Sequence, residues 1–186
     1  VDGSAVLTTM FHAFRAMGIW QDERGTNMLD TGAHYYDVYE TADGKYVSIG
    51  SIEPQFYKEL LRLTGLEGED LPWQQDRTAW PALKERLAAI FKAKTRDEWC
   101  AVFAGSDACV APVLDMDEAP LHPHNRSRNT FIEINGVTQP APAPRFSRTV
   151  PAMPSAPTVD GDAGAVLADW GFAGDEITEL QRLGAL

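Results

Sequence analysis

A single glutamate is the main candidate for chemistry, in the stretch GSIEPQFYKEL at residues 50–60. Glu53 is followed by Pro54, and a proline suits the first position of a helix because its missing N–H would be unpaired there. The carboxylate of Glu53 would then lie at the positive end of the helix dipole, which favours its ionised form. Such a carboxylate can orient a histidine and stabilise its imidazolium form. A structural glutamate at a helix start is the plainer interpretation, and these residues alone favour it.

The remaining polar motifs give weaker signals for chemistry. The sequence HPH at residues 122–124 holds two imidazoles, but no third ligand has a suitable spacing. We therefore expect a loop or helix-end role there and no metal site. Arg126 and Arg128 could bind a carboxylate or phosphate, although solvated or interface arginines are the commoner case. The sequence has no Gly-rich phosphate loop and no Gly-x-Ser-x-Gly nucleophile motif.

The sulfur-containing side chains bear on the substrate and on the redox environment. Met10, Met17 and Met28 could face a flexible acyl chain because thioethers adapt to varied apolar shapes, although such residues more often fill a core. Cys100 and Cys109 do not have the spacing of a zinc or redox site. We therefore expect a reduced, cytoplasmic protein.

Composition excludes several classes of protein. The 186 residues are 44% hydrophobic and 10% aromatic, which is enough for one core or two small lobes. The net charge of −11 opposes binding to a nucleic-acid backbone, which needs a basic surface. No apolar run approaches the roughly 20 residues of a membrane helix. The expected partners therefore include neither nucleic acid nor a membrane.

The candidate residues must be positioned by elements that the apolar spacing predicts. Residues 1–18 repeat apolar side chains in three- and four-residue steps, which predicts a largely buried helix. Such a helix without a lead-in is expected of a chain cut from a longer protein. Residues 34–51 alternate as a β-hairpin around Asp43-Gly44, whose residue types tolerate positive φ. The helix that begins at Pro54 has an apolar stripe and a glycine stop: Phe56, Leu60, Leu63 and Gly65.

Two more helices are predicted before residue 110. Thr95 and Glu98 match a capping box, in which each side chain accepts the backbone N–H of the other residue. The short helix that follows carries Trp99 and Phe103 one turn apart. The preceding helix, within residues 80–94, carries an apolar face: Leu83, Leu87, Ile90 and Phe91.

The second half of the chain combines short strands with a proline-rich segment. Residues 109–119 predict a short buried strand and then an acidic helix start. Residues 130–134 and 143–147 predict strands on either side of the turn at Asn135-Gly136. Residues 140–157 are rich in proline and should form an extended arm.

The predicted organisation has three parts. Two terminal helices are expected, opened by Asp162 and Asp175. Residues 1–20 form a helix of a large domain or its linker, residues 21–130 a small α+β domain, and residues 131–186 a return arm with terminal helices of the large domain.

Two stretches of the sequence resemble a known family. They are LDTGAHYYDVYETADGKYVSIGSIEPQFYKEL at residues 29–60 and CVAPVLDMDEAPLHPHNRSRNTFIEI at residues 109–134. Both resemble the second half of the α-methylacyl-CoA racemases, which belong to the family III CoA-transferase superfamily. The resemblance runs along essentially the whole chain.

The resemblance implies the fold of an interlocked homodimer. Each family subunit has a large α/β CoA-binding domain and a small domain joined by long arms, and the small domain of one subunit covers the active site of the other. The middle lobe of this chain would be the α+β small domain. The helices at the two ends of the chain and the extended arm would complete the large α/β domain, whose N-terminal half is absent.

The resemblance also implies an isomerase. The family epimerises C2 of 2-methyl-branched acyl-CoA thioesters by 1,1-proton transfer through an enolate, with coenzyme A as part of the substrate and no further cofactor. The proton-transfer histidine and aspartate lie in the missing half, so this chain alone is expected to be inactive. The catalytic glutamate of the IEPQF motif corresponds to Glu53. The resemblance maps four residues onto the substrate-binding surface: Met28, Leu29, Tyr36 and Ile52.

Two alternatives stay open. A family III CoA-transferase moves CoA between carboxylic acids through a covalent aspartyl intermediate, and its aspartate would also lie outside this chain. The IEPQF glutamate favours the racemase, because transferases usually have a different segment there. The other alternative is a non-catalytic interaction domain in which Glu53 only caps a helix.

Overall fold

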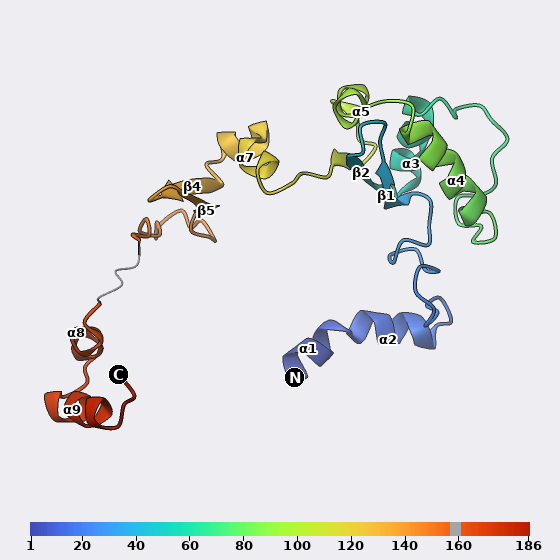
Figure 1. Ribbon diagram of the computed structural model, residues 1–186. Helices are drawn as coiled ribbons and strands as arrows, with labels where there is room; N and C mark the ends of the chain where they lie inside the picture. Colours follow the sequence, from blue (N-terminus) through green and yellow to red (C-terminus); the bar gives the residue numbers. More distant parts are fainter. Residues whose placement is uncertain (157–160) are drawn as a thin grey trace. The chain divides into compact units, whose positions relative to one another are not determined.

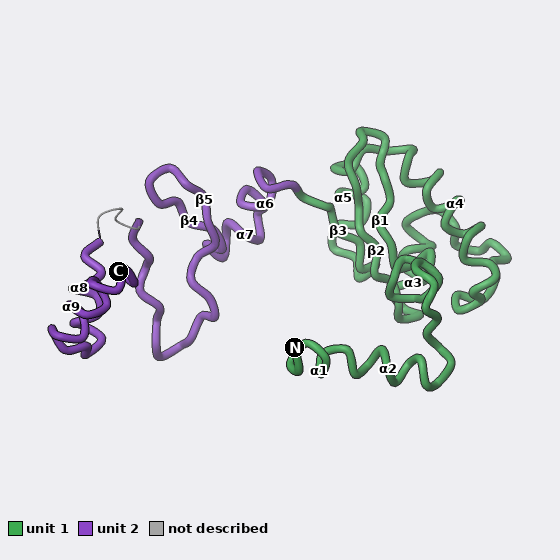
Figure 2. Tube along the Cα trace, turned by 60° about the horizontal axis from the view of Figure 1, so that its bottom comes forward, with its two compact units in different colours: residues 1–114 green, residues 115–186 purple. Residues whose placement is uncertain are grey.

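The computed structural model describes residues 1–156 and 161–186, and it contains two compact units, residues 1–114 and residues 115–186 (Figure 2). Each unit is described by itself. The predicted domains 1–20, 21–130 and 131–186 refer to a longer polypeptide, so their boundaries stay a prediction.

A three-stranded antiparallel sheet forms the centre of the first unit. Its order is β1 (Tyr36–Glu40), β2 (Tyr46–Gly50) and β3 (Val110–Pro112). β1 and β2 form the predicted hairpin, with Tyr36 opposite Gly50, and Gly44 in their loop has a φ of 73°. Tyr39 and Val47 lie opposite each other and are buried, because alternate residues of a strand face the same side of the sheet.

Three helices gather around this sheet (Figure 1): α3 (Pro54–Leu63), α4 (Trp80–Phe91) and α5 (Arg96–Phe103). Pro54 begins α3 as predicted, and Gly65 follows the end of the helix with a φ of 79°. The buried face of α3 differs slightly from the predicted stripe. Leu60 is buried, but Tyr57 is buried in place of Phe56 because its hydroxyl bonds to a core histidine.

Aromatic packing joins the helices to the sheet. Phe91 stacks on Tyr39 with ring centroids 5.4 Å apart, and it meets Trp99 at 4.9 Å. The indole N–H of Trp99 donates to the carbonyl of Phe91 at 2.9 Å, so burial of the ring leaves no unpaired donor. Burial of each such side chain contributes roughly 1.5–3 kcal/mol.

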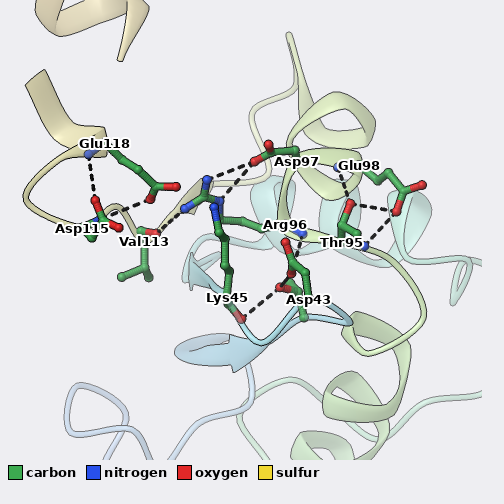
Figure 3. Close-up of polar contacts among 10 residues, drawn as sticks. Asp43, Lys45, Thr95, Arg96, Asp97, Glu98, Val113, Asp115 and Glu118 are labelled. Carbon is green, nitrogen blue, oxygen red and sulfur yellow. Dashed lines mark hydrogen bonds and ion pairs between the residues drawn. The ribbon is translucent and has the colours of Figure 1, made fainter. Parts of the chain in front are cut away.

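Polar contacts of the buried Arg96 tie three segments together (Figure 3). Its backbone N–H donates to the carboxylate of Asp43 in the β1–β2 loop at 3.2 Å, and its Nη1 donates to the carbonyl of Val113 at 3.1 Å. The predicted capping box of Thr95 and Glu98 is present at the start of the same helix. These contacts fix the loop and the end of β3 relative to α5, because buried charged groups keep their hydrogen bonds.

The prediction for the N-terminus was wrong in two respects. Residues 1–18 contain two helices, α1 (Asp2–Leu7) and α2 (Thr9–Ala16), and neither has a buried residue. At the break, the hydroxyls of Thr8 and Thr9 donate to carbonyls one turn earlier, which disfavours a continuous helix. Met10 and Met17 are 48% and 66% exposed. Apolar spacing shows which side chains favour burial, but it does not supply a surface to bury them. In this unit α3, α4 and α5 already cover the core, so α1 and α2 stay exposed.

The second unit opens with two short helices and a hairpin: α6 (Glu118–Leu121), α7 (Pro123–Ser127), β4 (Phe131–Ile134) and β5 (Val137–Pro140). The strand predicted at residues 143–147 was wrong, because β5 follows Asn135-Gly136 directly. These two residues have φ of 51° and 78°, and a two-residue turn of this kind pairs the residues on either side of it.

The second unit closes with α8 (Ala163–Asp169) and α9 (Gly174–Arg182). Asp162 caps α8 as predicted and accepts the N–H of Ala165 at 3.1 Å. Asp175 is not the cap of α9, because the helix begins at Gly174 and its N-cap residue is Ala173. The carboxylate of Glu176 accepts the backbone N–H of Ala173 at 2.8 Å. Residues 141–156 of the predicted arm contain neither helix nor strand, and Pro157 lies outside the described residues.

Candidate active site

Glu53 lies between β2 and α3 and occupies the N-cap position of α3. Its backbone is extended, with φ −72° and ψ 143°, and its carbonyl accepts the N–H groups of Phe56 and Tyr57, both at 3.0 Å. Its carboxylate is exposed and makes no capping hydrogen bond to the helix. The side chain is therefore free to interact with a group outside this helix.

The backbone next to Glu53 is held by residues distant in the sequence. The N–H of Gly50 donates to the carbonyl of Cys109 at 2.9 Å. The hydroxyl of Ser51 donates to the carbonyl of Ala108 at 2.5 Å. The side-chain amide of Gln74 donates to the carbonyl of Ser51 at 3.1 Å and to the following carbonyl at 2.9 Å. These bonds fix the backbone from which Glu53 projects, since breaking them would leave buried polar groups unpaired.

The four predicted substrate-binding residues fall into two groups. Tyr36 pairs with Gly50 at the end of the hairpin and, like Ile52, is half-buried. Met28 and Leu29 line a cavity of about 310 Å³, which the candidate glutamate does not line. Met28, Tyr36 and Ile52 all pack against the hydrophobic core of the first unit. The core thus connects the two groups.

Most of the cavity is built from residues that the sequence analysis did not identify. Aromatic and aliphatic walls combine with amide and cationic side chains: Phe14, Ile19, Trp20, Trp80, Gln75 and Arg77. The stretch WQQDR at residues 73–77 mixes aromatic, amide and cationic residues outside the predicted elements. That mixture of residue types is the sequence feature that could have indicated the polar wall of the cavity.

A buried polar network holds one wall of the cavity. Asn27 is 1% exposed, and its Nδ2 donates to the carboxylate of Asp30 and to the carbonyl of Gln21, both at 2.9 Å. Its Oδ1 accepts the N–H of Gln21 at 2.8 Å and Nη2 of Arg77 at 3.2 Å. Burial alone would raise the pKa of Asp30, but hydrogen bonds from Asn27 and from backbone N–H groups hold that pKa below its usual value. The ionised carboxylate therefore stabilises this loop.

His34 is buried beside the same core and is 1% exposed. Its Nε2 lies 2.8 Å from the hydroxyl of Tyr57, and its Nδ1 has no hydrogen-bond partner among the described residues. Burial lowers the pKa of His34 to about 4, because the imidazolium would lose its hydration. The imidazole is therefore neutral at neutral pH.

The remaining histidine and arginine candidates belong to the second unit. His122 caps α7, and its Nδ1 accepts the backbone N–H of His124 at 3.3 Å, which confirms the expected helix-end role. Arg126 and Arg128 are exposed. In the described part of the chain, no three His, Cys, Asp or Glu side chains gather where they could hold a metal ion. Nor does any helix there have the length and apolar character needed to cross a membrane.

The charge of Glu53 affects the pKa of the Cys109 thiol. This cysteine is exposed and has a φ of 53°, and neither it nor Cys100 forms a disulfide. Desolvation raises the pKa of the Cys109 thiol, and the carboxylates of Glu53 and Asp107 raise it further. Glu53 therefore lies close enough for its charge to act on this sulfur.

Comparison with solved structures identifies the class of fold. A crystal structure of the hypothetical protein Rv3272 from Mycobacterium tuberculosis aligns over 89% of this chain and 44% of its own, with a TM-score of 0.63 and 18% identity. A second crystal structure of the same protein, in an orthorhombic form, aligns over 80% of this chain and 38% of its own, with a TM-score of 0.57. The chain is thus a mixed α/β partial domain of that fold.

Comparison of sequences identifies the family. The profile of CoA-transferase family III matches residues 3–163, and the chain belongs to this family. It is 46% identical over 184 residues to the α-methylacyl-CoA racemase of Mus musculus and 41% identical over 185 residues to that of Homo sapiens. Each alignment covers 97% of this chain, and the chain spans 48% of each relative.

We expect the stability of the first unit to fall as the pH decreases from 6.5 to 4. In this range the unfolded chain binds a proton at His34, whose ordinary pKa is 6.5, and the folded chain does not. Decreasing the pH from 6.5 to 5 should lower the free energy of unfolding by up to about 2 kcal/mol, as measured by urea denaturation. His34→Phe should reduce this loss, and His12→Phe on the exposed α2 should retain it. An equally large loss in His34→Phe would contradict the assignment.

We also expect Glu53→Gln to speed alkylation of Cys109. Removal of the negative charge should lower the pKa of the thiol and increase its thiolate fraction, on the order of twofold. The measurement is the rate of iodoacetamide labelling at pH 8, followed by peptide mass spectrometry. Cys100 provides the internal control and should label at an unchanged rate. No change at Cys109 would mean that the two side chains lie farther apart than the structure has them.

Proposed function

We propose that the complete protein containing this chain epimerises C2 of 2-methyl-branched acyl-CoA thioesters. The exposed carboxylate of Glu53 carries this proposal, because a glutamate that only capped α3 would bond to the helix N–H groups. The identity of 46% and 41% to two α-methylacyl-CoA racemases, over 97% of the chain, supports the same reaction.

The reaction is a 1,1-proton transfer through an enolate. A histidine and an aspartate outside this chain exchange the α-proton on opposite faces of C2, and Glu53 hydrogen-bonds to that histidine. The carboxylate keeps the imidazole oriented and stabilises its protonated form while the enolate carries negative charge. Leu29, Tyr36 and Ile52 contact the substituents of C2, and Met28 extends this surface along the acyl chain.

The assembly is an interlocked homodimer in which the predicted small domain, residues 21–130, covers the active site of the partner subunit. Coenzyme A is bound mainly by the part of the protein outside this chain and belongs to the substrate, so no separate cofactor takes part. Large apolar side chains on both units support packing against further domains, since Met17 is 66% exposed and Trp170 82% exposed. The fact that the chain spans 48% of each racemase supports the same arrangement.

A CoA-transferase is the second candidate, because the matching family profile is named for that activity. It would move CoA between carboxylic acids through an aspartyl intermediate. In that reaction C2 keeps its proton, so the fate of this proton separates the two enzymes. A non-catalytic interaction domain would change neither C2 nor the thioester.

The complete protein should therefore incorporate deuterium at C2 of (2R)-2-methyldecanoyl-CoA in heavy water and invert its configuration. The isolated 186-residue chain should do neither, because it lacks the proton-transfer pair. Mass spectrometry and chiral chromatography measure both, with succinate present as a CoA acceptor. CoA transfer without exchange would assign the protein to the transferases, and neither reaction would favour the interaction domain.

In the complete protein, Glu53→Gln should lower kcat by roughly 100-fold and change KM much less. The reason is that the carboxylate stabilises the protonated histidine of the transition state rather than the bound thioester. Glu59→Gln is a matched control on the same helix, where the native carboxylate pairs with Arg62 at 2.7 Å on the surface, and its kcat should change less than about twofold. A kcat in Glu53→Gln equal to that of the control would return Glu53 to a structural role.

A further inference from the structure

The cavity lined by Met28 and Leu29 has both apolar and polar walls. Trp20 and Trp80 provide broad apolar surfaces, whereas Gln75 and Arg77 provide hydrogen-bond donors. Its volume of about 310 Å³ is at the lower end of the roughly 300–1,000 Å³ found for ligand pockets, which suits a medium-length chain better than a large ring system.

Arg77 is a partly buried cation without an ion-pair partner. Its Nη2 donates to the carbonyl of Thr26 at 2.6 Å and to Oδ1 of Asn27 at 3.2 Å, and its guanidinium lies 5.5 Å from the centre of the Trp80 ring. No carboxylate of a described residue lies within ion-pair distance, although acidic residues outnumber basic ones by 27 to 16 in this chain. Asp30 is linked to Arg77 only through the Asn27 side chain.

The hydrogen bonds of Arg77 and Gln75 leave donors for a ligand. Both bonds of Arg77 use Nη2, so Nε and Nη1 donate to no described residue. The Oε1 of Gln75 accepts the hydroxyl of Tyr35 at 2.6 Å, and its NH₂ group likewise donates to no residue that the structure describes. A guanidinium and an amide at one apolar cavity suit a planar anion, because carboxylates accept paired hydrogen bonds from arginine.

We propose that this cavity binds an alkyl chain that ends in a carboxylate. The chain lies against the tryptophans and Met28, and the carboxylate accepts hydrogen bonds from Arg77 and Gln75. The anion also neutralises a partly buried cation that forms no ion pair with any described residue. Two sources have this chemistry: a free fatty acid, and an acyl-CoA whose chain has a second carboxylate at its far end.

The second source rests on the proposed function. Leu29 lines the cavity and is also a proposed contact of the C2 substituents, so an acyl chain attached to C2 would continue into this space. The far end of a chain of suitable length would then meet Arg77. The enzyme would prefer 2-methyl-branched thioesters with a terminal carboxylate over those with a terminal methyl group.

The first experiment needs no enzymatic activity. Octanoate and 1-octanol are titrated into the full 186-residue chain by isothermal titration calorimetry. Octanoate should bind at least about tenfold more tightly, because hydrogen bonds between a guanidinium and a carboxylate are stronger than those to a neutral hydroxyl. Equal affinity of the two ligands, or no binding of octanoate, would overturn the proposal without the use of any variant.

Variants locate the carboxylate. Arg77→Met should abolish the preference for octanoate, and Arg77→Lys, which keeps the charge and preserves the loop better, should retain part of it. Arg62→Met is the matched control on the surface of α3 and should behave like the native chain. Octanoate affinity that is unchanged in a folded Arg77→Met chain would overturn the assignment of Arg77.

The two sources are distinguished in the complete protein. Deuterium exchange is compared for 2-methyldecanoyl-CoA and for its analogue with a carboxylate at C10. A roughly tenfold higher kcat/KM for the analogue, lost in Arg77→Met, supports the acyl-CoA source. Equal exchange together with octanoate binding supports a free fatty acid. Octanoate binding with no exchange of either thioester would refute the proposed function and leave the carboxylate site intact.

Discussion

The central position of β2 is the constraint on which the first unit depends. β2 pairs with β1 through a short loop and with β3 through a connection of about sixty residues that contains α3, α4 and α5. Closing a connection of that length has an entropic cost, which the buried aromatic core and the hydrogen bonds at Ser51 and Gly50 offset. The same pairing places the carbonyl of Cys109 against the N–H of Gly50, three residues before Glu53, so β3 helps to hold the backbone of the candidate site.

Buried polar side chains then set the loops around this sheet. Hydrogen bonds of Arg96 join the β1–β2 loop, α5 and the end of β3. Hydrogen bonds of the Asn27 side chain join Gln21, Asp30 and Arg77. Each of these groups would cost several kcal/mol if it were buried without partners, so its bonds select one loop conformation among many. His34 is the exception, because its Nδ1 has no partner among the described residues and its neutrality depends on burial. The stability of the unit is therefore linked to pH through a residue without a proposed catalytic role.

The candidate site combines a rigid part and an adaptable part. Glu53 projects from a backbone held by Gln74 and Ser51, and the proposed proton transfer would depend on this, because a displaced carboxylate would no longer orient its partner. The cavity between Trp20 and Trp80 is lined by α2, by loop residues and by the start of α4, and its Met28 can follow the shape of different chains.

The local features of this protein follow from short stretches of its sequence. Pro54 at a helix start, the Thr95–Glu98 capping box and the turn at Asn135-Gly136 were predictable because their contacts span only a few residues. The IEPQF motif also indicated the family, which the comparisons show. Three features could be learned only from the folded chain: which apolar faces are buried, where β5 lies, and that Arg77 bonds to Asn27 beside a cavity. These outcomes depend on contacts between residues far apart in the chain, and neither spacing nor composition records which distant surfaces will meet.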